Sequence, residues 1–125
     1  AANETLFKCE NLEALQLQDL KHIKSLDFLI NLKLIKYLQI ESLKNIETYK
    51  PILSCPSLEI FLAYNSKPID KSLEGLINLK TVGIGDRYSK EEIDNLVSNF
   101  TGDTIRIRAK EIKGKLNYIG QFDSM

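Results

Sequence analysis

One spacing constrains what this chain of 125 residues can fold into: hydrophobic residues recur at intervals of 23 positions. Five apolar residues form a first set, and adding 23 to each number, twice, generates two further sets. Fourteen of the fifteen positions are apolar, and Ser66 is the exception. The positions are Leu12, Leu15, Leu17, Leu20, Ile23, Ile35, Leu38, Ile40, Leu43, Ile46, Leu58, Phe61, Ala63, Ser66 and Ile69. Such a period predicts one structural unit repeated along the chain, each copy burying its apolar face against the next.

The pattern continues after a shortened step of 21 residues and then after another 23, where the match is weaker. These later positions are Leu79, Val82 and Ile84, followed by Gly102, Ile105 and Ile107. Apolar residues also precede each set at spacings of three, as Leu26, Leu29 and Leu32 precede Ile35. Leu6 and Cys9 precede Leu12 in the same way. We therefore expect residues 1–11 to form an N-terminal cap or a partial repeat.

Within each unit, the last two apolar residues of the core are two apart, which is the period of a β-strand. Both side chains then point to one face, and the strands of successive units stack into a parallel sheet about 4.8 Å apart. The predicted strands lie near 13–18, 36–41, 59–64, 80–85 and 103–108. Residues 115–119 are a candidate for an extra strand or a cap.

The return segments are expected to be short helices. Ser89 followed by Glu92 is a capping box, which predicts a helix through Ile93, Leu96, Val97 and Phe100. Ser25 and Asp70 are candidate caps for shorter helical turns. Pro51 and Pro56 limit the segment between them to a short helical turn, because proline is tolerated in the first turn of a helix and beyond its end.

The sequence resembles the leucine-rich repeat (LRR) family, and most closely its short bacterial and internalin-like class. The family core L-x-x-L-x-L reads LEALQL at 12–17, IKYLQI at 35–40 and LKTVGI at 79–84, with a degenerate copy, LEIFLA, at 58–63. The resemblance implies an α/β fold, a right-handed solenoid with a parallel sheet on its concave face and short helices or turns on its convex face. The family usually places Asn, Cys or Thr three residues after the last strand leucine. Here those positions hold Leu20, Leu43, Ser66, Arg87 and Lys110.

On this interpretation the chain is a single LRR domain over 1–125. The repeats are expected at 12–34, 35–57, 58–78, 79–101 and 102–110, with 111–125 as a C-terminal cap.

The residues between the inward leucines are expected to face outward from the sheet and to bind a partner. They are Gln16, Gln18, Tyr37, Gln39, Glu41, Ile60, Leu62, Tyr64, Arg106 and Arg108. Segment 59–64 is apolar on both faces, and an apolar patch with tyrosines and a polar rim is typical of a protein-binding surface. Two alternatives stay open. The degenerate repeat could shift in register and bury Ile60, Leu62 and Tyr64, or the C-terminal cap could cover them.

Neither catalysis nor metal binding is expected. Cys9 and Cys55 occupy equivalent positions two repeats apart, which places them about 9–10 Å from each other and beyond disulfide reach. We predict two buried free thiols, which favours a cytoplasmic location. His22 is the one histidine, and we expect it on the surface. Lys and Arg together number 17, as do Asp and Glu, and this balance argues against a nucleic-acid partner. No apolar stretch is long enough to span a membrane.

The expected function is therefore protein binding without a cofactor, by a chain that is monomeric on its own. One form of it is a small bacterial immunity or adaptor protein that binds and blocks a partner. The alternative is a non-catalytic recognition fragment of a larger LRR protein, such as an internalin-like surface protein or an accessory domain of an enzyme. A third hypothesis is a structural spacer within a longer array.

Overall fold

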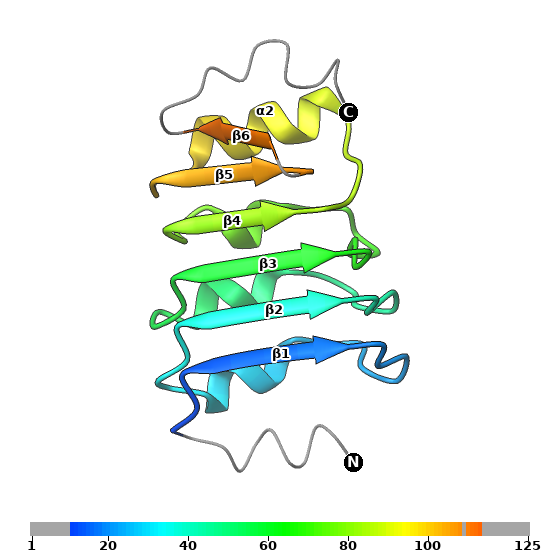
Figure 1. The fold of residues 1–125 in the computed structure, drawn as a ribbon, viewed down its shortest axis with the longest axis vertical. Coiled ribbons are helices and arrows are strands. Elements are labelled where there is room, and N and C mark those ends of the chain that lie inside the picture. The colour runs from blue at the N-terminus through cyan, green and yellow to red at the C-terminus, as the bar shows by residue number, and fades with distance from the viewer. Residues whose placement is uncertain (1–10, 109, 114–125) are drawn as a thin grey trace.

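The computed structural model describes residues 11–108 and 110–113, and this part of the chain has an α/β fold with one sheet. Successive strands are neighbours in the sheet, so the order in space is the order in the sequence. The first five strands are parallel, and the sixth is antiparallel to the fifth (Figure 1). The strands are β1 (Ala14–Gln18), β2 (Tyr37–Glu41), β3 (Ile60–Tyr64), β4 (Thr81–Ile84), β5 (Thr104–Ile107) and β6 (Lys110–Lys113).

The five predicted strands are confirmed, each beginning one residue later than expected. Strand β6 was not expected as a strand, because its residues lie at the end of the last predicted repeat and the start of the predicted cap. It pairs Lys110 with Ile107, so the chain reverses over two residues after β5. The candidate strand at 115–119 and the candidate cap at 1–11, apart from Asn11, lie outside the described residues.

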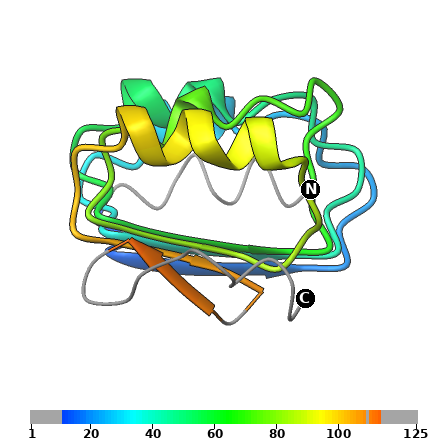
Figure 2. The same ribbon diagram turned by 90° about the horizontal axis from the view of Figure 1, so that it is seen from above.

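Short helices form a second layer behind the sheet, as Figure 2 shows from above. They are the single-turn 3-10 helices η1 (Asp27–Asn31), η2 (Lys50–Ser54) and η3 (Glu74–Leu76), and the α-helix α2 (Lys90–Asn99). The capping box predicted for α2 is present: the Ser89 side chain accepts a hydrogen bond from the Glu92 backbone, and the Glu92 side chain accepts one from the Ser89 backbone. Pro51 lies in the first turn of η2, as expected for a helix so short.

Ser25 and Asp70 do not cap helices, contrary to expectation. The Ser25 hydroxyl accepts a hydrogen bond from the backbone of Asp27, and an Asp70 carboxylate oxygen accepts one from the backbone of Ser72. Helices η1 and η3 instead begin after Leu26 and Leu73, neither of which makes a side-chain cap bond. Side chains that bond two residues ahead fix a local turn, so these two residues shape the approach to each helix.

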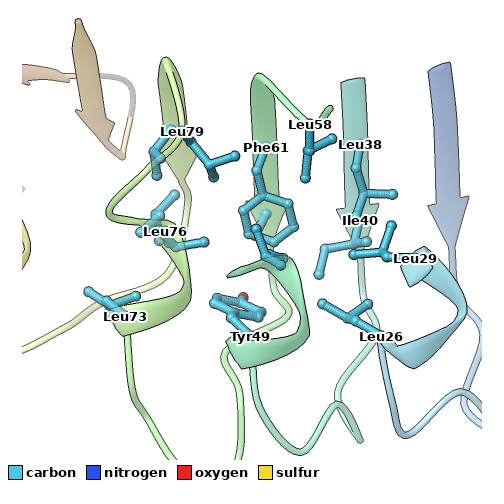
Figure 3. Packing of buried hydrophobic residues seen from close by; sticks show 14 of the residues in the cluster. Leu26, Leu29, Leu38, Ile40, Tyr49, Leu58, Phe61, Leu73, Leu76 and Leu79 are labelled. Carbon is cyan, nitrogen blue, oxygen red and sulfur yellow. The ribbon is translucent and has the colours of Figure 1, made fainter. Parts of the chain in front are cut away.

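The core lies between the sheet and the helical layer, where leucines of η1 and η3 meet the inward residues of the strands (Figure 3). Two inward rows run across all five parallel strands. One contains Leu15, Leu38, Phe61, Val82 and Ile105, and the other contains Leu17, Ile40, Ala63, Ile84 and Ile107. Leu26, Leu29 and Leu32 are fully buried, as the three-residue spacing predicts. Ile69 is an exception: its side chain is 64% exposed, and the neighbouring Pro68 is buried.

The residues that precede each parallel strand carry charges of alternating sign. They are Glu13, Lys36, Glu59, Lys80 and Asp103, and the backbone of each of the last four donates a hydrogen bond to the carbonyl of the one before. Lys80 Nζ lies 3.7 Å from Glu59 Oε2. A single exposed ion pair contributes little to the free energy of unfolding. Alternation of sign does, however, prevent like charges from lying next to each other on adjacent strands. These five charged residues lie just before the strands, beside the sheet.

Within the described residues, no helix is long and apolar enough to cross a membrane.

Candidate functional site

The face of the sheet that points away from the core carries the predicted partner-binding residues, and we call it the open face. Its residues align in columns across the parallel strands, as the repeat predicts. One column contains Ala14, Tyr37, Ile60, Thr81 and Thr104, a second contains Gln16, Gln39, Leu62, Gly83 and Arg106, and a third contains Gln18, Glu41 and Tyr64. The strand pairing therefore brings together nine of the ten residues singled out from the sequence.

Strand β3 shows which of its two apolar sides faces the core. Phe61 and Ala63 are completely buried, whereas Ile60 and Leu62 are half-buried and Tyr64 is 37% exposed. Strand β3 therefore keeps the register of its neighbours, and the alternative in which Ile60, Leu62 and Tyr64 turn inward is wrong. The other alternative, coverage by the C-terminal cap, falls on residues outside the described part of the chain.

Arg108 is the predicted site residue that does not belong to a strand. Strand β5 ends at Ile107, and Arg108 follows with a positive φ of 51° in the tight turn that leads into β6. Its Nη1 atom is buried. The alternation of inward and outward side chains holds only while the chain is extended, so the predicted position in the third column fails where the chain reverses.

Charge is scarce on the open face. Of the thirteen strand residues of β1 to β5 that point away from the core, two are charged, Glu41 and Arg106. Charged residues make up 27% of the whole chain. Depletion of charge together with tyrosine and arginine distinguishes the centre of protein interfaces from ordinary surface. Glu41 lies on β2 and Arg106 on β5, so the two charges stand on opposite sides of β3.

Two glycines determine how the side chains of β3 lie on the open face. A β-carbon at Gly83 would approach Leu62 Cδ2 to 2.6 Å, and one at Gly85 would approach Tyr64 Cδ1 to the same distance. Leu62 therefore leans over Gly83 of β4 and Tyr64 over Gly85, the residue that follows β4, and the two glycines leave room for these side chains. A glycine at or next to a strand often marks a place where another part of the molecule comes close, and here it is a pair of side chains from the neighbouring strand.

Two further features give the open face a defined shape. The Tyr37 hydroxyl donates a hydrogen bond of 2.6 Å to Gln39 Oε1, which fixes two neighbouring side chains of β2. A hollow of about 170 Å³ lies beside Leu62 and Tyr64, above β4, and Arg106 and Thr81 also line it. The open face thus carries a recess beside β3.

The turn that follows β3 holds a buried polar network that sequence reasoning missed. Ser66 is completely buried, and its hydroxyl accepts a hydrogen bond of 2.9 Å from the Leu43 backbone and donates one of 2.9 Å to the Tyr64 carbonyl. The Ser66 backbone donates to Asp86 Oδ2 at 3.0 Å, and its carbonyl accepts from the Tyr49 hydroxyl. Ser66 therefore bonds the backbone of the turn that follows β3.

Tyr49 anchors this network from the helical layer. Its ring packs edge-on against Phe61 with the ring centroids 5.0 Å apart, and burial raises the pKa of its hydroxyl well above the usual 10.0. Burial likewise raises the pKa of the nearby Tyr88 hydroxyl. Both phenols stay protonated at neutral pH, so neither acts as an acid or a base there. The packing of Tyr49 on Phe61 and its hydrogen bond to Ser66 hold strand β3 in place. In the sequence, this polar network is indicated only by Ser66, the one polar residue in a column of apolar repeat positions.

The remaining candidates take the positions expected from the sequence. His22 is exposed. Cys55 is free and buried, and burial raises the pKa of its thiol, whereas Cys9 lies outside the described residues. Within 11–108 and 110–113, no group of three or more His, Cys, Asp or Glu side chains is arranged to hold a metal ion.

No family model, no curated protein and no solved structure matches this chain. An assignment of its function therefore rests on the geometry and chemistry of the open face.

Proposed function

We propose that the chain is an LRR solenoid whose open, concave face binds another protein. The regular stacking supports the solenoid. The parallel strands begin at Ala14, Tyr37, Ile60, Thr81 and Thr104, so each starts 23 residues after the previous one except β4, which starts 21 after β3. Every repeat pairs with its immediate neighbours, which is the defining property of a solenoid. The right-handed sense of the solenoid and its concave face are part of this proposal.

The orientation of strand β3 is the observation that carries the proposed binding function. The fold already buries Phe61 and Ala63, so it does not need Ile60, Leu62 and Tyr64 for its core. These three side chains form an apolar strip at the middle of a face that is poor in charge. Exposed apolar strips with a polar rim mark interaction sites on soluble proteins, and here Gln16, Gln39 and Glu41 provide the rim.

The partner proposed is a protein, bound without a metal or a cofactor. The two charged residues that β1 to β5 present on the open face, Glu41 and Arg106, have opposite signs, which does not favour a polyanion such as nucleic acid. A rigid sheet surface with a central tyrosine and leucine suits a protein surface, where aromatic and aliphatic anchors contribute most of the binding free energy. We propose that the chain acts by binding and blocking or recruiting that partner, as a small immunity or adaptor protein does, and that it catalyses no reaction.

The test compares a double variant of the open face with a single variant on the helical side. Leu62→Asp with Tyr64→Ala disrupts the apolar strip, and Leu53→Asp places a charge on an exposed leucine of η2, which is 46% exposed on the helical side. The unaltered chain is used to capture proteins from the cells that produce it, and the captured protein is then purified and its Kd measured. We expect the double variant to weaken binding at least about a hundredfold, since loss of a hot spot costs about 2 kcal/mol or more per residue.

Leu53→Asp should leave the Kd within about twofold, and circular dichroism should show that both variants fold. Equal Kd values for the double variant and the unaltered chain would refute binding through the open face.

A further inference from the structure

The third column of the open face contains a carboxylate whose neighbours in the column are uncharged. Glu41 is the last residue of β2, is half-buried, and lies between Gln18 of β1 and Tyr64 of β3. Within the described part of the chain it belongs to no ion pair. The other charged residue that β1 to β5 present on this face, Arg106, lies on β5 and has an interaction of its own. The negative charge of Glu41 is therefore available to a bound cation.

Tyr64 presents one side of its ring to solvent next to this carboxylate. A β-carbon at Gly85 would stand 2.6 Å from Tyr64 Cδ1, and one at Gly83 would stand 3.8 Å from the Tyr64 hydroxyl oxygen. Because the ring rests on the two glycines, the exposed side of Tyr64 is the one turned away from the sheet. Paired residues on adjacent strands are about 4.8 Å apart, and β2 and β3 end at the same edge of the sheet (Figure 1). One ligand group can therefore contact both side chains.

An arginine side chain has the chemistry that these two neighbours require. Its planar guanidinium donates two parallel hydrogen bonds to a carboxylate, and the same plane stacks on the face of a tyrosine ring. Its methylene stem packs on apolar surface, which Leu62 provides two residues before Tyr64 on β3. A lysine ammonium lacks the plane that stacks on a ring, so charge and shape together favour arginine.

We propose that the bound protein places an arginine side chain against Glu41 and the exposed side of the Tyr64 ring, with an apolar residue next to it on Leu62. This inference rests on the proposed function, because it names the chemical feature by which a protein partner is recognised at the same face. It also orients the partner: the arginine lies where β2 and β3 end, and the apolar residue lies nearer the middle of β3.

The probe is the dipeptide N-acetyl-leucyl-arginine amide, and its control carries citrulline, a neutral residue of nearly the same shape, in place of arginine. Binding is followed through the amide NMR signals of the full chain. We expect the arginine dipeptide to shift the signals of Glu41, Leu62 and Tyr64 with a Kd of about a millimolar, which is within the bound for a ligand of this size. The citrulline dipeptide should bind about fivefold more weakly, because an exposed ion pair and an exposed cation–π contact each contribute modestly. Added salt should reduce this difference.

Paired variants locate the interaction. Glu41→Gln keeps the shape of the side chain and removes its charge, so it should abolish the preference for the arginine dipeptide. The matched control, Glu47→Gln, makes the same change at an exposed position between β2 and η2 and should retain the preference. Tyr64→Leu should weaken binding of the arginine dipeptide about threefold, whereas Tyr64→Phe, which keeps a ring, should not. Dispersed amide signals show that each variant is folded.

Equal binding of the two dipeptides to the unaltered chain, or no binding of either, would overturn the inference. A preference for arginine that persists in Glu41→Gln, or shifts that cluster away from the ends of β2 and β3, would also overturn it. If the dipeptide test fails while Leu62→Asp with Tyr64→Ala still abolishes partner binding, the inference is wrong and the proposed function stands. If the double variant binds the partner normally, the proposed function itself is wrong.

Discussion

Leu62 of β3 lies over Gly83 of β4, so close that a β-carbon at Gly83 would stand 2.6 Å from Leu62 Cδ2. Tyr64 has the same relationship with Gly85. The side chains of one strand thus cover part of the next, and an apolar strip on β3 becomes a surface two strands wide with a recess beside it. Fixing side chains before a partner arrives lowers the entropy that binding must overcome.

Two glycine substitutions should differ sharply in their effect on stability. In Gly83→Ala the new methyl group meets the end of a flexible leucine, and we expect the free energy of unfolding to change by less than about 1 kcal/mol. In Gly75→Ala the methyl group would overlap the Tyr49 carbonyl, and overpacking against backbone should cost about 3 kcal/mol or more. Urea unfolding measures both. Equal losses would show that β3 and β4 pack differently from this account.

Ser66→Ala should destabilise the protein by about 1–3 kcal/mol, because the buried Leu43 amide loses its acceptor. The matched control is Ser98→Ala at an exposed position of α2, which should change the free energy of unfolding by less than about 0.5 kcal/mol. Thermal or urea unfolding gives both values. If Ser66→Ala were as stable as the control, the backbone amide of Leu43 would not need the Ser66 hydroxyl as its hydrogen-bond acceptor.

The capping box of α2 should make stability depend on pH. The Ser89 backbone donates a hydrogen bond of 2.9 Å to Glu92 Oε1, and this bond lowers the pKa of Glu92 below the usual 4.5. A group whose pKa is lower in the folded state stabilises that state above its unfolded pKa and loses the effect as the pH falls through its folded pKa.

The difference in unfolding free energy between the unaltered chain and Glu92→Gln should therefore be largest above about pH 5 and should shrink toward lower pH. Urea unfolding across that pH range measures it. Ser89→Ala should cost about 1 kcal/mol at neutral pH, the usual value of an N-cap. If the difference in unfolding free energy between the unaltered chain and Glu92→Gln grew as the pH fell, the result would contradict the capping geometry.

The Cys55 thiol should react slowly with thiol reagents in the folded protein. The thiolate is the reactive form, and burial raises the pKa of this thiol while shielding it from reagents. The measurement uses a Cys9→Ser variant, so that Cys55 is the only cysteine, and compares the labelling rate with and without urea. Labelling as fast in buffer as in urea would place Cys55 at the surface.

The sequence predicted the strands and their faces because two periods coincide. The spacing of 23 residues identifies equivalent positions, and the strand period of two assigns Leu38 inward and Gln39 outward without ambiguity. The one-residue shift at each strand start is within the usual uncertainty of element ends. The same periods placed Ile60, Leu62 and Tyr64 on the open face, although segment 59–64 is apolar on both sides.

Other features depend on contacts that no local pattern encodes. The Ser66 hydroxyl bonds a backbone amide 23 residues earlier in the chain, and a polar residue in an apolar column gives no sign of its partner. The predicted outward position of Arg108 was wrong because the chain reverses into β6, which ends the alternation of inward and outward side chains. The position of Leu62 over Gly83 depends on such a contact too, since a glycine in a strand does not reveal which neighbouring side chain fills the space that it leaves.

The central claim is that a partner protein docks on the open face, and site-specific photo-crosslinking tests it most directly. A benzophenone side chain replaces Leu62 in one protein and Leu53, on the helical side, in another, and both are irradiated in the cells that produce the chain. The account predicts a discrete crosslinked species from position 62 that is absent from position 53. Crosslinking from position 53 alone, or with equal yield from both positions, would contradict it.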